Sequence, residues 1–126
     1  METENTVSIW IGNFATKLDL DEFINLKYDE EGEVVPSLFY NQYNIDIDDI
    51  DDYLIEKEVF ETSFTNLFDM LKGASYDNII VKNLEQKGIK ANIAPNNTLI
   101  LIYNYQFDSN VPQTSNTEFV ATVRYK

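Results

Sequence analysis

The spacing of hydrophobic positions near the start of the chain predicts a strand. Residues 6–14, TVSIWIGNF, alternate and are rich in β-branched and aromatic side chains. One face of this strand carries three aliphatic residues: Val7, Ile9 and Ile11. Trp10 lies on the opposite face, where we expect it to be part of the core. Gly12 suits a strand end or a close approach of another backbone segment.

A second pair of strands is predicted near the other end. Residues 98–107, TLILIYNYQF, begin as a continuous apolar run and finish alternating, which is typical of a central strand covered on both faces at one end. Residues 117–125 alternate, and the polar segment 108–116 predicts a mobile connection between two antiparallel strands. We expect three tyrosines here to be sheet residues rather than a base-stacking platform: Tyr103, Tyr105 and Tyr125.

Helical spacing begins after the first strand. Thr16 is a suitable N-cap for a helix that runs to about Lys27. Its apolar stripe consists of Leu20, Phe23 and Ile24. Ser37 is expected to start a short second helix, because Pro36 disfavours helical backbone at the residue before it.

Two further helices are predicted in the middle of the chain. Thr62 or Ser63 caps the first, which Gly73 ends. Its stripe consists of Phe64, Leu67, Phe68 and Leu71. Ser75 caps the second, which ends at Gly88. Its inward residues are expected to be Tyr76, Ile79, Ile80 and Leu84.

The order of these elements predicts one α+β domain over residues 1–126, a mostly antiparallel sheet with about four helices packed on it. The chain has no cysteine and no histidine, which excludes disulfides, thiolate metal sites and histidine-based nucleophilic catalysis. No secretory signal precedes the first strand, and no apolar run approaches the roughly 18 residues that span a bilayer. We therefore expect a cytoplasmic protein that is not an enzyme and has no membrane partner.

Charge is distributed unevenly along the chain, whose net charge is −13. Residues 1–63 contain 17 acids and 3 bases, a net of −14, whereas residues 64–126 contain 5 acids and 6 bases, a net of +1. An anionic half of this kind is repelled by nucleic acids and anionic membranes and attracted by basic proteins. No nucleic-acid partner is expected.

The segment NIDIDDIDDYLIEKE, residues 44–58, has five aspartates between positions 46 and 52. The spacing of its apolar residues, Ile47, Ile50 and Leu54, predicts a short helical turn followed by a strand that reaches Glu61. The isoleucines should then point inward while the aspartates face water.

The spacing of residues in this segment does not match a helix-loop-helix calcium site. A helix-loop-helix calcium site that starts at Asp46 would need an oxygen ligand at Ile50 and a glutamate at Lys57. The chain also contains no glycine-rich phosphate-binding motif. We expect no metal and no other cofactor.

Two acidic clusters remain as candidate partner-binding residues. The first surrounds a predicted turn at Gly32 and consists of Asp29, Glu30, Glu31 and Glu33. The second consists of Asp46, Asp48, Asp49, Asp51, Asp52, Glu56 and Glu58. Either these acids form a surface for a basic protein, or they are a solvated face that only keeps the protein in solution.

Several segments resemble a known family. They are VSIWIGNF (7–14), DEFINLKYDEEGE (21–33), PSLFYNQYNIDIDDI (36–50), EVFE (58–61) and SYDNII (75–80). Together they are similar, in the same order, to the immunity protein 22 family of bacterial polymorphic toxin systems. The similarity covers about the first two thirds of the chain.

The resemblance implies a small cytoplasmic protein that binds a cognate toxin domain stoichiometrically and neutralises it without catalysis. Nuclease toxins, which are often basic, are common partners in such systems. The alternative is an acidic protein-interaction or adaptor domain with no toxin partner. A toxin gene immediately upstream would favour the first reading.

Overall fold

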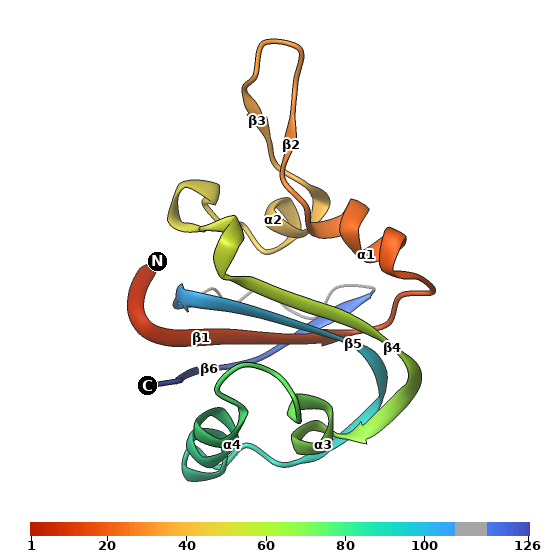
Figure 1. The fold of residues 1–126 in the computed structure, drawn as a ribbon, viewed down its shortest axis with the longest axis vertical. Helices are drawn as coiled ribbons and strands as arrows, with labels where there is room; N and C mark the ends of the chain where they lie inside the picture. Colours follow the sequence, from red (N-terminus) through yellow and green to blue (C-terminus); the bar gives the residue numbers. More distant parts are fainter. Residues whose placement is uncertain (108–115) are drawn as a thin grey trace.

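An antiparallel sheet of four strands, in the order β4–β5–β1–β6, forms the centre of the molecule (Figure 1). This computed structural model describes residues 1–107 and 116–126. The strands of the sheet are β1 (Glu2–Gly12), β4 (Ile55–Asn66), β5 (Asn92–Tyr105) and β6 (Thr117–Arg124). A separate hairpin consists of β2 (Lys27–Tyr28) and β3 (Val34–Val35).

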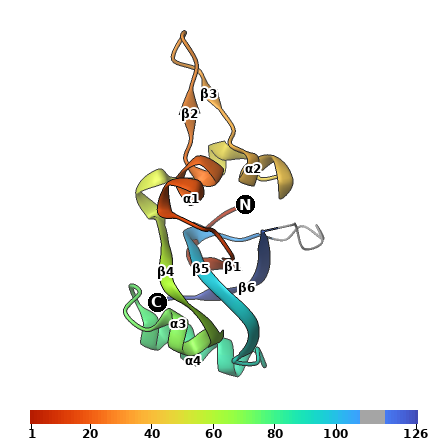
Figure 2. The ribbon, with the colours of Figure 1, turned by 90° about the vertical axis from the view of Figure 1, so that its right-hand side faces the viewer.

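Helices cover both faces of the sheet (Figures 1 and 2). One layer consists of α1 (Lys17–Ile24), α2 (Leu38–Gln42) and two single 3-10 turns, η1 (Ile47–Asp49) and η2 (Asp52–Leu54). The opposite layer consists of α3 (Leu67–Leu71) and α4 (Asp77–Gln86). The predicted α+β class, with an antiparallel sheet and four α-helices, is confirmed.

The sheet separates two hydrophobic cores. Under α3 and α4, β1 contributes its predicted aliphatic face of Val7, Ile9 and Ile11. Under α1 and α2, the core is built around Trp10, which is fully buried. Its ring centroid lies between 5.1 and 5.7 Å from those of Phe39, Tyr43, Phe107 and Phe119. The predicted placement of the aliphatic residues on one face of β1 and of a buried Trp10 on the other is thus confirmed.

Gly12 is needed where β1 ends. A Cβ atom at this position would lie 2.4 Å from the carbonyl oxygen of Asn116, which is closer than real Cβ contacts come. The predicted close backbone approach is confirmed. The polar connection predicted over 108–116 lies, apart from its last residue, outside the described residues.

Helix α1 begins as predicted and ends early. Thr16 Oγ1 accepts a hydrogen bond from the Asp19 backbone N–H at 3.1 Å, so Thr16 is the N-cap. The helix stops at Ile24 because Asn25 has extended backbone angles, and Lys27 already belongs to the hairpin. The short helix expected after Ser37 is confirmed as α2.

The helix predicted from Thr62 or Ser63 is wrong in its first half. Strand β4 continues to Asn66, and Phe64 pairs with Asn96 of β5 after a register shift. Helix α3 is only five residues long, and its N-cap is Asn66, whose Oδ1 accepts hydrogen bonds from two backbone N–H groups. Pairing with β5 overrides the helical spacing because it satisfies the backbone of a whole strand.

The start and inner face of α4 also differ from the prediction. Its N-cap is Tyr76, with φ of 59°, rather than Ser75. Tyr76 and Ile79 are exposed, while Ile80 and Leu84 are buried as expected. Of the four residues predicted to point inward, Ile80 and Leu84 belong to the core under α3 and α4.

The aspartate-rich segment forms two 3-10 turns instead of the single helical turn predicted, and then the predicted strand. Ile47 and Ile50 pack against the core around Trp10. The neighbouring aspartates are exposed, except Asp49, which is half-buried. The strand begins at Ile55 and extends beyond the predicted end at Glu61.

We predict that Trp10→Ala lowers the free energy of unfolding by about 3–5 kcal/mol, because it removes a large buried aromatic side chain from the centre of a ring cluster. Chemical denaturation measures this change. Trp10→Phe is the matched control and should cost less, because it keeps a ring and Trp10 Nε1 has no hydrogen-bond partner among the described residues. A midpoint unchanged in Trp10→Ala would contradict the assignment.

Candidate functional site

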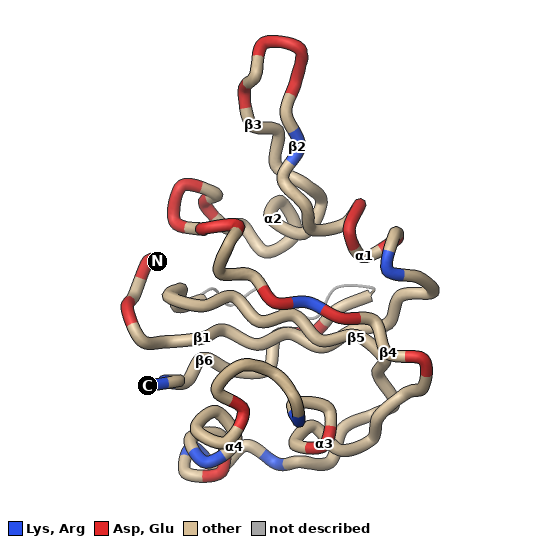
Figure 3. The backbone as a smooth tube through the Cα atoms, viewed as in Figure 1, with Lys and Arg blue, Asp and Glu red and all other residues tan. Residues whose placement is uncertain are grey.

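The sheet divides the charge of the molecule into two unequal parts. Residues 17–54, which form the layer of α1, α2 and the hairpin, contain twelve acids and two bases, a net charge of −10. Residues 67–90, which form the α3–α4 layer, contain three acids and four bases, a net of +1. Figure 3 shows more acids on the α1–α2 side of the sheet than on the α3–α4 side. We call this side the acidic layer.

The first predicted cluster forms the tip of the β2–β3 hairpin. Asp29 closes the turn, because its Oδ1 accepts hydrogen bonds from the backbone N–H groups of Glu31 at 2.9 Å and Glu33 at 3.0 Å. Gly32 supplies the positive φ of 82° that the turn requires. The side chains of Glu30, Glu31 and Glu33 are exposed. Asp29 therefore shapes the tip, and the three glutamates present its charge.

The hairpin projects from the body of the molecule as an arm (Figures 1 and 2). Every residue from 27 to 36 is exposed. Tyr28, whose side chain is 62% exposed, and the two valines of β3, Val34 and Val35, show apolar surface below the acidic tip. An exposed two-stranded hairpin is only marginally stable in water. A binding partner would stabilise such an arm.

The second cluster lies on the two 3-10 turns of the acidic layer. Asp46 Oδ1 accepts a hydrogen bond from the Asp48 backbone N–H at 2.9 Å, and Asp51 Oδ1 accepts one from Tyr53 N–H at 3.0 Å. Asp49 lies 3.9 Å from the amino group of Met1. Asp48 and Asp52 are exposed. Asp46 and Asp51 thus stabilise the two turns through hydrogen bonds to backbone N–H groups, while Asp48 and Asp52 face solvent.

Two of the three acids of β4, the predicted Glu56 and Glu58, face the other way. Lys57, between them, points to the acidic layer and lies 3.6 Å from Asp21 Oδ1. Strand alternation therefore directs Glu56 and Glu58 to the α3–α4 side. Glu56 accepts hydrogen bonds from the Tyr103 hydroxyl at 2.7 Å and from Ser75 N–H at 3.2 Å. The structure brings the hairpin and turn acids to one side of the sheet, but not these two.

Sequence reasoning missed other residues of the acidic layer. Asp19 and Glu22 of α1 are exposed and add to its charge. Tyr53, in η2 among the aspartates, is 95% exposed. Most aromatic residues of the chain lie on apolar stripes, but Tyr53 lies outside the spacing Ile47–Ile50–Leu54. This departure is the one sequence signal that could have identified Tyr53 as exposed.

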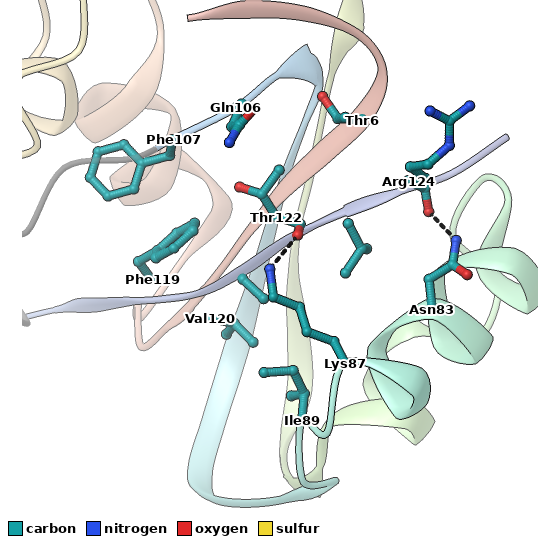
Figure 4. A pocket seen from close by; sticks show the side chains of 12 residues that line it. Thr6, Asn83, Lys87, Ile89, Gln106, Phe107, Phe119, Val120, Thr122 and Arg124 are labelled. Atoms are coloured by element: carbon teal, nitrogen blue, oxygen red, sulfur yellow. Dashed lines mark hydrogen bonds between the residues drawn. The ribbon is translucent and has the colours of Figure 1, made fainter.

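A cavity of about 580 Å³ lies beside the edge strand β6 (Figure 4). Lys87 Nζ donates a hydrogen bond to the Thr122 carbonyl at 2.9 Å, and Asn83 Nδ2 donates one to the Arg124 carbonyl at 2.7 Å. These side chains, one from α4 and one from its C-cap residue, bind backbone acceptors of the edge strand. The contacts protect the edge of the sheet from pairing with another strand. The ammonium group of Lys87 is used in one of these hydrogen bonds.

Burial changes the proton affinity of two tyrosines near the predicted acids. Desolvation raises the pKa of Tyr40, and the charge of Asp52 raises it further. Desolvation also raises the pKa of Tyr103, and the hydrogen bond to Glu56 and the charge of that carboxylate add to the effect. Both hydroxyls therefore stay protonated at neutral pH, where Tyr103 donates a hydrogen bond to Glu56 and the Tyr40 ring packs in the core.

The described residues were also compared with the requirements of a metal site and of a membrane-spanning helix. Over residues 1–107 and 116–126, no group of three or more carboxylates is arranged to hold a metal ion. Within the same residues, no helix is long and apolar enough to cross a membrane.

The chain belongs to the Immunity protein 22 family, whose model matches residues 7–126. The match extends the similarity from the first two thirds to nearly the whole chain. No curated protein and no solved structure matched.

We predict that stability falls above about pH 10, the ordinary pKa of tyrosine. Below that pH both the folded and unfolded states keep the protons of Tyr40 and Tyr103. Above it the unfolded state releases them while the folded state retains them, so each tyrosine reduces the unfolding free energy by about 1.4 kcal/mol per pH unit.

Denaturation between pH 9 and 11.5 measures this slope. Tyr40→Phe should flatten it while leaving stability at pH 7 nearly unchanged, because the Tyr40 hydroxyl has no hydrogen-bond partner among the described residues. Tyr53→Phe, at an exposed ring, is the control and should follow the parent protein. A slope equally steep in Tyr40→Phe would contradict the assigned cause.

Proposed function

We propose that this protein neutralises a cognate toxin domain by stoichiometric binding through its acidic layer, in the cytoplasm of the cell that produces the toxin. The observation that carries the proposal is the segregation of charge, a net of −10 in residues 17–54 against +1 in residues 67–90. Membership of an immunity-protein family supports a toxin as the partner.

Charge of one sign on one side of a small protein acts mainly on the rate of encounter. A field of this kind speeds the association of an oppositely charged protein and selects the orientation in which the two meet. The favoured partner is therefore a basic domain. A nuclease toxin fits, because its substrate site must attract phosphates and would also attract clustered carboxylates.

Exposed tyrosines within the acidic layer support binding rather than solvation alone. Tyr28 and Tyr53 each lie beside one of the acidic clusters. Tyrosine is enriched at interface positions that contribute most to affinity, because its ring buries a large area and its hydroxyl can hydrogen-bond. A face that only maintained solubility would have no need of exposed aromatic rings.

Inhibition in this proposal needs no chemistry from the chain. With histidine and cysteine absent, the chain lacks the commonest general base of enzymes and any cysteine nucleophile. Binding alone can block a toxin if the arm or the acidic turns occupy its substrate site. Co-expression with the toxin domain encoded next to the protein tests this mechanism: survival of the cells without a complex in pull-down would reject it.

We predict that replacing Asp48, Asp49, Asp51 and Asp52 with asparagine slows association with that toxin domain by about tenfold and flattens its salt dependence. Asparagine Oδ1 can still accept the hydrogen bond that Asp51 accepts, so the turns should remain folded. Stopped-flow association at several salt concentrations measures both effects.

The matched control removes the same number of charges from elsewhere. It replaces Asp69, Asp77, Glu85 and Glu118, which lie in the α3–α4 layer and on β6, with the corresponding amides. This variant should associate at nearly the parent rate. Equal slowing in both variants would mean that total charge, rather than the acidic layer, guides the encounter.

We predict that Tyr28→Ala weakens the toxin complex at least about tenfold, which corresponds to about 1.4 kcal/mol. The loss should lie mainly in the dissociation rate, because a neutral ring contributes little to long-range attraction. The free protein should keep its stability within about 0.5 kcal/mol, since the arm lies outside both cores.

Ile79→Ala supplies the control for the arm. It shortens an exposed apolar side chain on the α3–α4 side, and we expect it to leave both stability and dissociation rate unchanged. A Tyr28→Ala complex as long-lived as the parent complex would show that the arm is not part of the interface.

A further inference from the structure

A second cavity, of about 480 Å³, lies at the end of the sheet where the two layers meet. Tyrosines from separate segments surround it: Tyr53, Tyr76, Tyr103 and Tyr125. The centroid of Tyr125 lies 4.9 Å from those of both Tyr103 and Tyr76. The three rings form one connected aromatic wall, and Tyr53 stands on the side of the acidic turns.

A carboxylate lies at this wall. Glu56 also lines the cavity and holds the Tyr103 hydroxyl through the 2.7 Å hydrogen bond. Its other contacts are to the backbone N–H and hydroxyl of Ser75. All of these partners are neutral donors, so the negative charge of Glu56 is not balanced by a cation in the contacts it makes among the described residues.

The protein's own lysine shows which chemistry the wall accepts. Lys126 Nζ lies 5.5 Å from the ring centroid of Tyr125 and 5.8 Å from that of Tyr76. Both distances fall within the range of cation–π attraction. An ammonium group is therefore already placed against two of the rings, and the cavity has room for a larger cationic side chain beside or instead of it.

Two residues with left-handed backbone line the same cavity. They are Tyr76, with φ of 59°, and Asn104, with φ of 58°. Asparagine tolerates this conformation, whereas it is strained for tyrosine. The ring that follows from this backbone lies beside Tyr125 and under the lysine ammonium. Strain of this kind gathers at functional sites.

From this geometry we infer that the tyrosine cavity is a receptor for a lysine or arginine side chain of the toxin, and that Lys126 occupies it in the free protein. This inference rests on the proposed function, since the toxin supplies the side chain. Aromatic faces and a carboxylate together favour a cation over an anion or a purely apolar group. Asp51 and Asp52, which adjoin Tyr53 in η2, would direct a basic side chain to the entrance.

A small probe tests the cavity without the toxin. N-acetyl-lysine methylamide and N-acetyl-arginine methylamide are titrated into the protein, and the ring resonances of Tyr76 and Tyr125 are followed by NMR. N-acetyl-norleucine methylamide is the matched control, because it has the lysine carbon chain without the ammonium group. We expect saturable shifts with the two cationic probes and none with norleucine.

Two variants make the titration specific to the site. Lys126→Ala should tighten binding of the cationic probes by about fivefold, because it removes the internal competitor. Tyr76→Asn should weaken it at least about threefold through the loss of a ring. Asparagine suits the left-handed backbone, so this variant should fold. Equal shifts with norleucine, or an affinity unchanged in Lys126→Ala, would overturn the inference.

The toxin complex then separates this inference from the proposed function. Tyr76→Asn should increase its dissociation rate about threefold or more and leave the salt dependence of association unchanged. If the complex forms but Tyr76→Asn dissociates like the parent, the assignment of a toxin side chain to the cavity is wrong. If no complex forms, the proposed function fails, whereas the probe titration still decides whether the cavity binds a cation.

Discussion

Burial of both faces of the central strands β1 and β5 is the constraint on which the rest of the structure depends. Trp10 points into one core while Ile9 and Ile11 point into the other, so neither face of the sheet can be left to water. Two helical layers are needed, and the chain supplies them from separate segments. Most of the charged side chains are therefore exposed on the outside of these layers.

The acidic layer can exist because its charges lie at the edge of this scaffold and are spread over separate elements. Repulsion between carboxylates weakens with distance and with exposure to water. The aspartates that begin each turn also satisfy backbone N–H groups, as Asp29 does in the hairpin and Asp51 in η2. Some of the acids therefore stabilise the local backbone that presents the others.

The sequence predicted the two faces of β1 and the start of α1 correctly because each depends on a local pattern. Alternation determines the faces of β1, and Thr16 is a local cap. The helix prediction failed between Thr62 and Asn66. There an apolar spacing suitable for a helix is overridden by pairing with β5, in which Phe64 lies opposite Asn96. The sequence did not predict that the hairpin projects as an arm, for a related reason. Whether a turn packs on the body of the molecule or projects from it depends on which surfaces the rest of the chain covers.

The same limit applies to the candidate site. Acid clusters are visible in a sequence, and those of the hairpin and the turns do share one side of the sheet. The direction of Glu56 is not visible, because it follows from the register of β4 against β5 and from the position of Ser75 just before α4. Nor could spacing reveal that Tyr53, Tyr76 and Tyr125, distant in sequence, surround one cavity.

The acidic layer and the tyrosine cavity would contribute to different steps of binding. Long-range attraction is screened within about 8 Å at physiological salt, so it speeds encounter more than it prolongs a complex. A long-lived complex needs side chains held in desolvated pockets. The cavity adjoins the acidic turns through Tyr53, and Glu56 faces it rather than the acidic layer. The aspartates of η1 and η2 would attract a basic side chain of the toxin toward the cavity. At short range, where attraction between exposed charges no longer distinguishes one partner from another, this side chain would contact the aromatic faces and the carboxylate of Glu56.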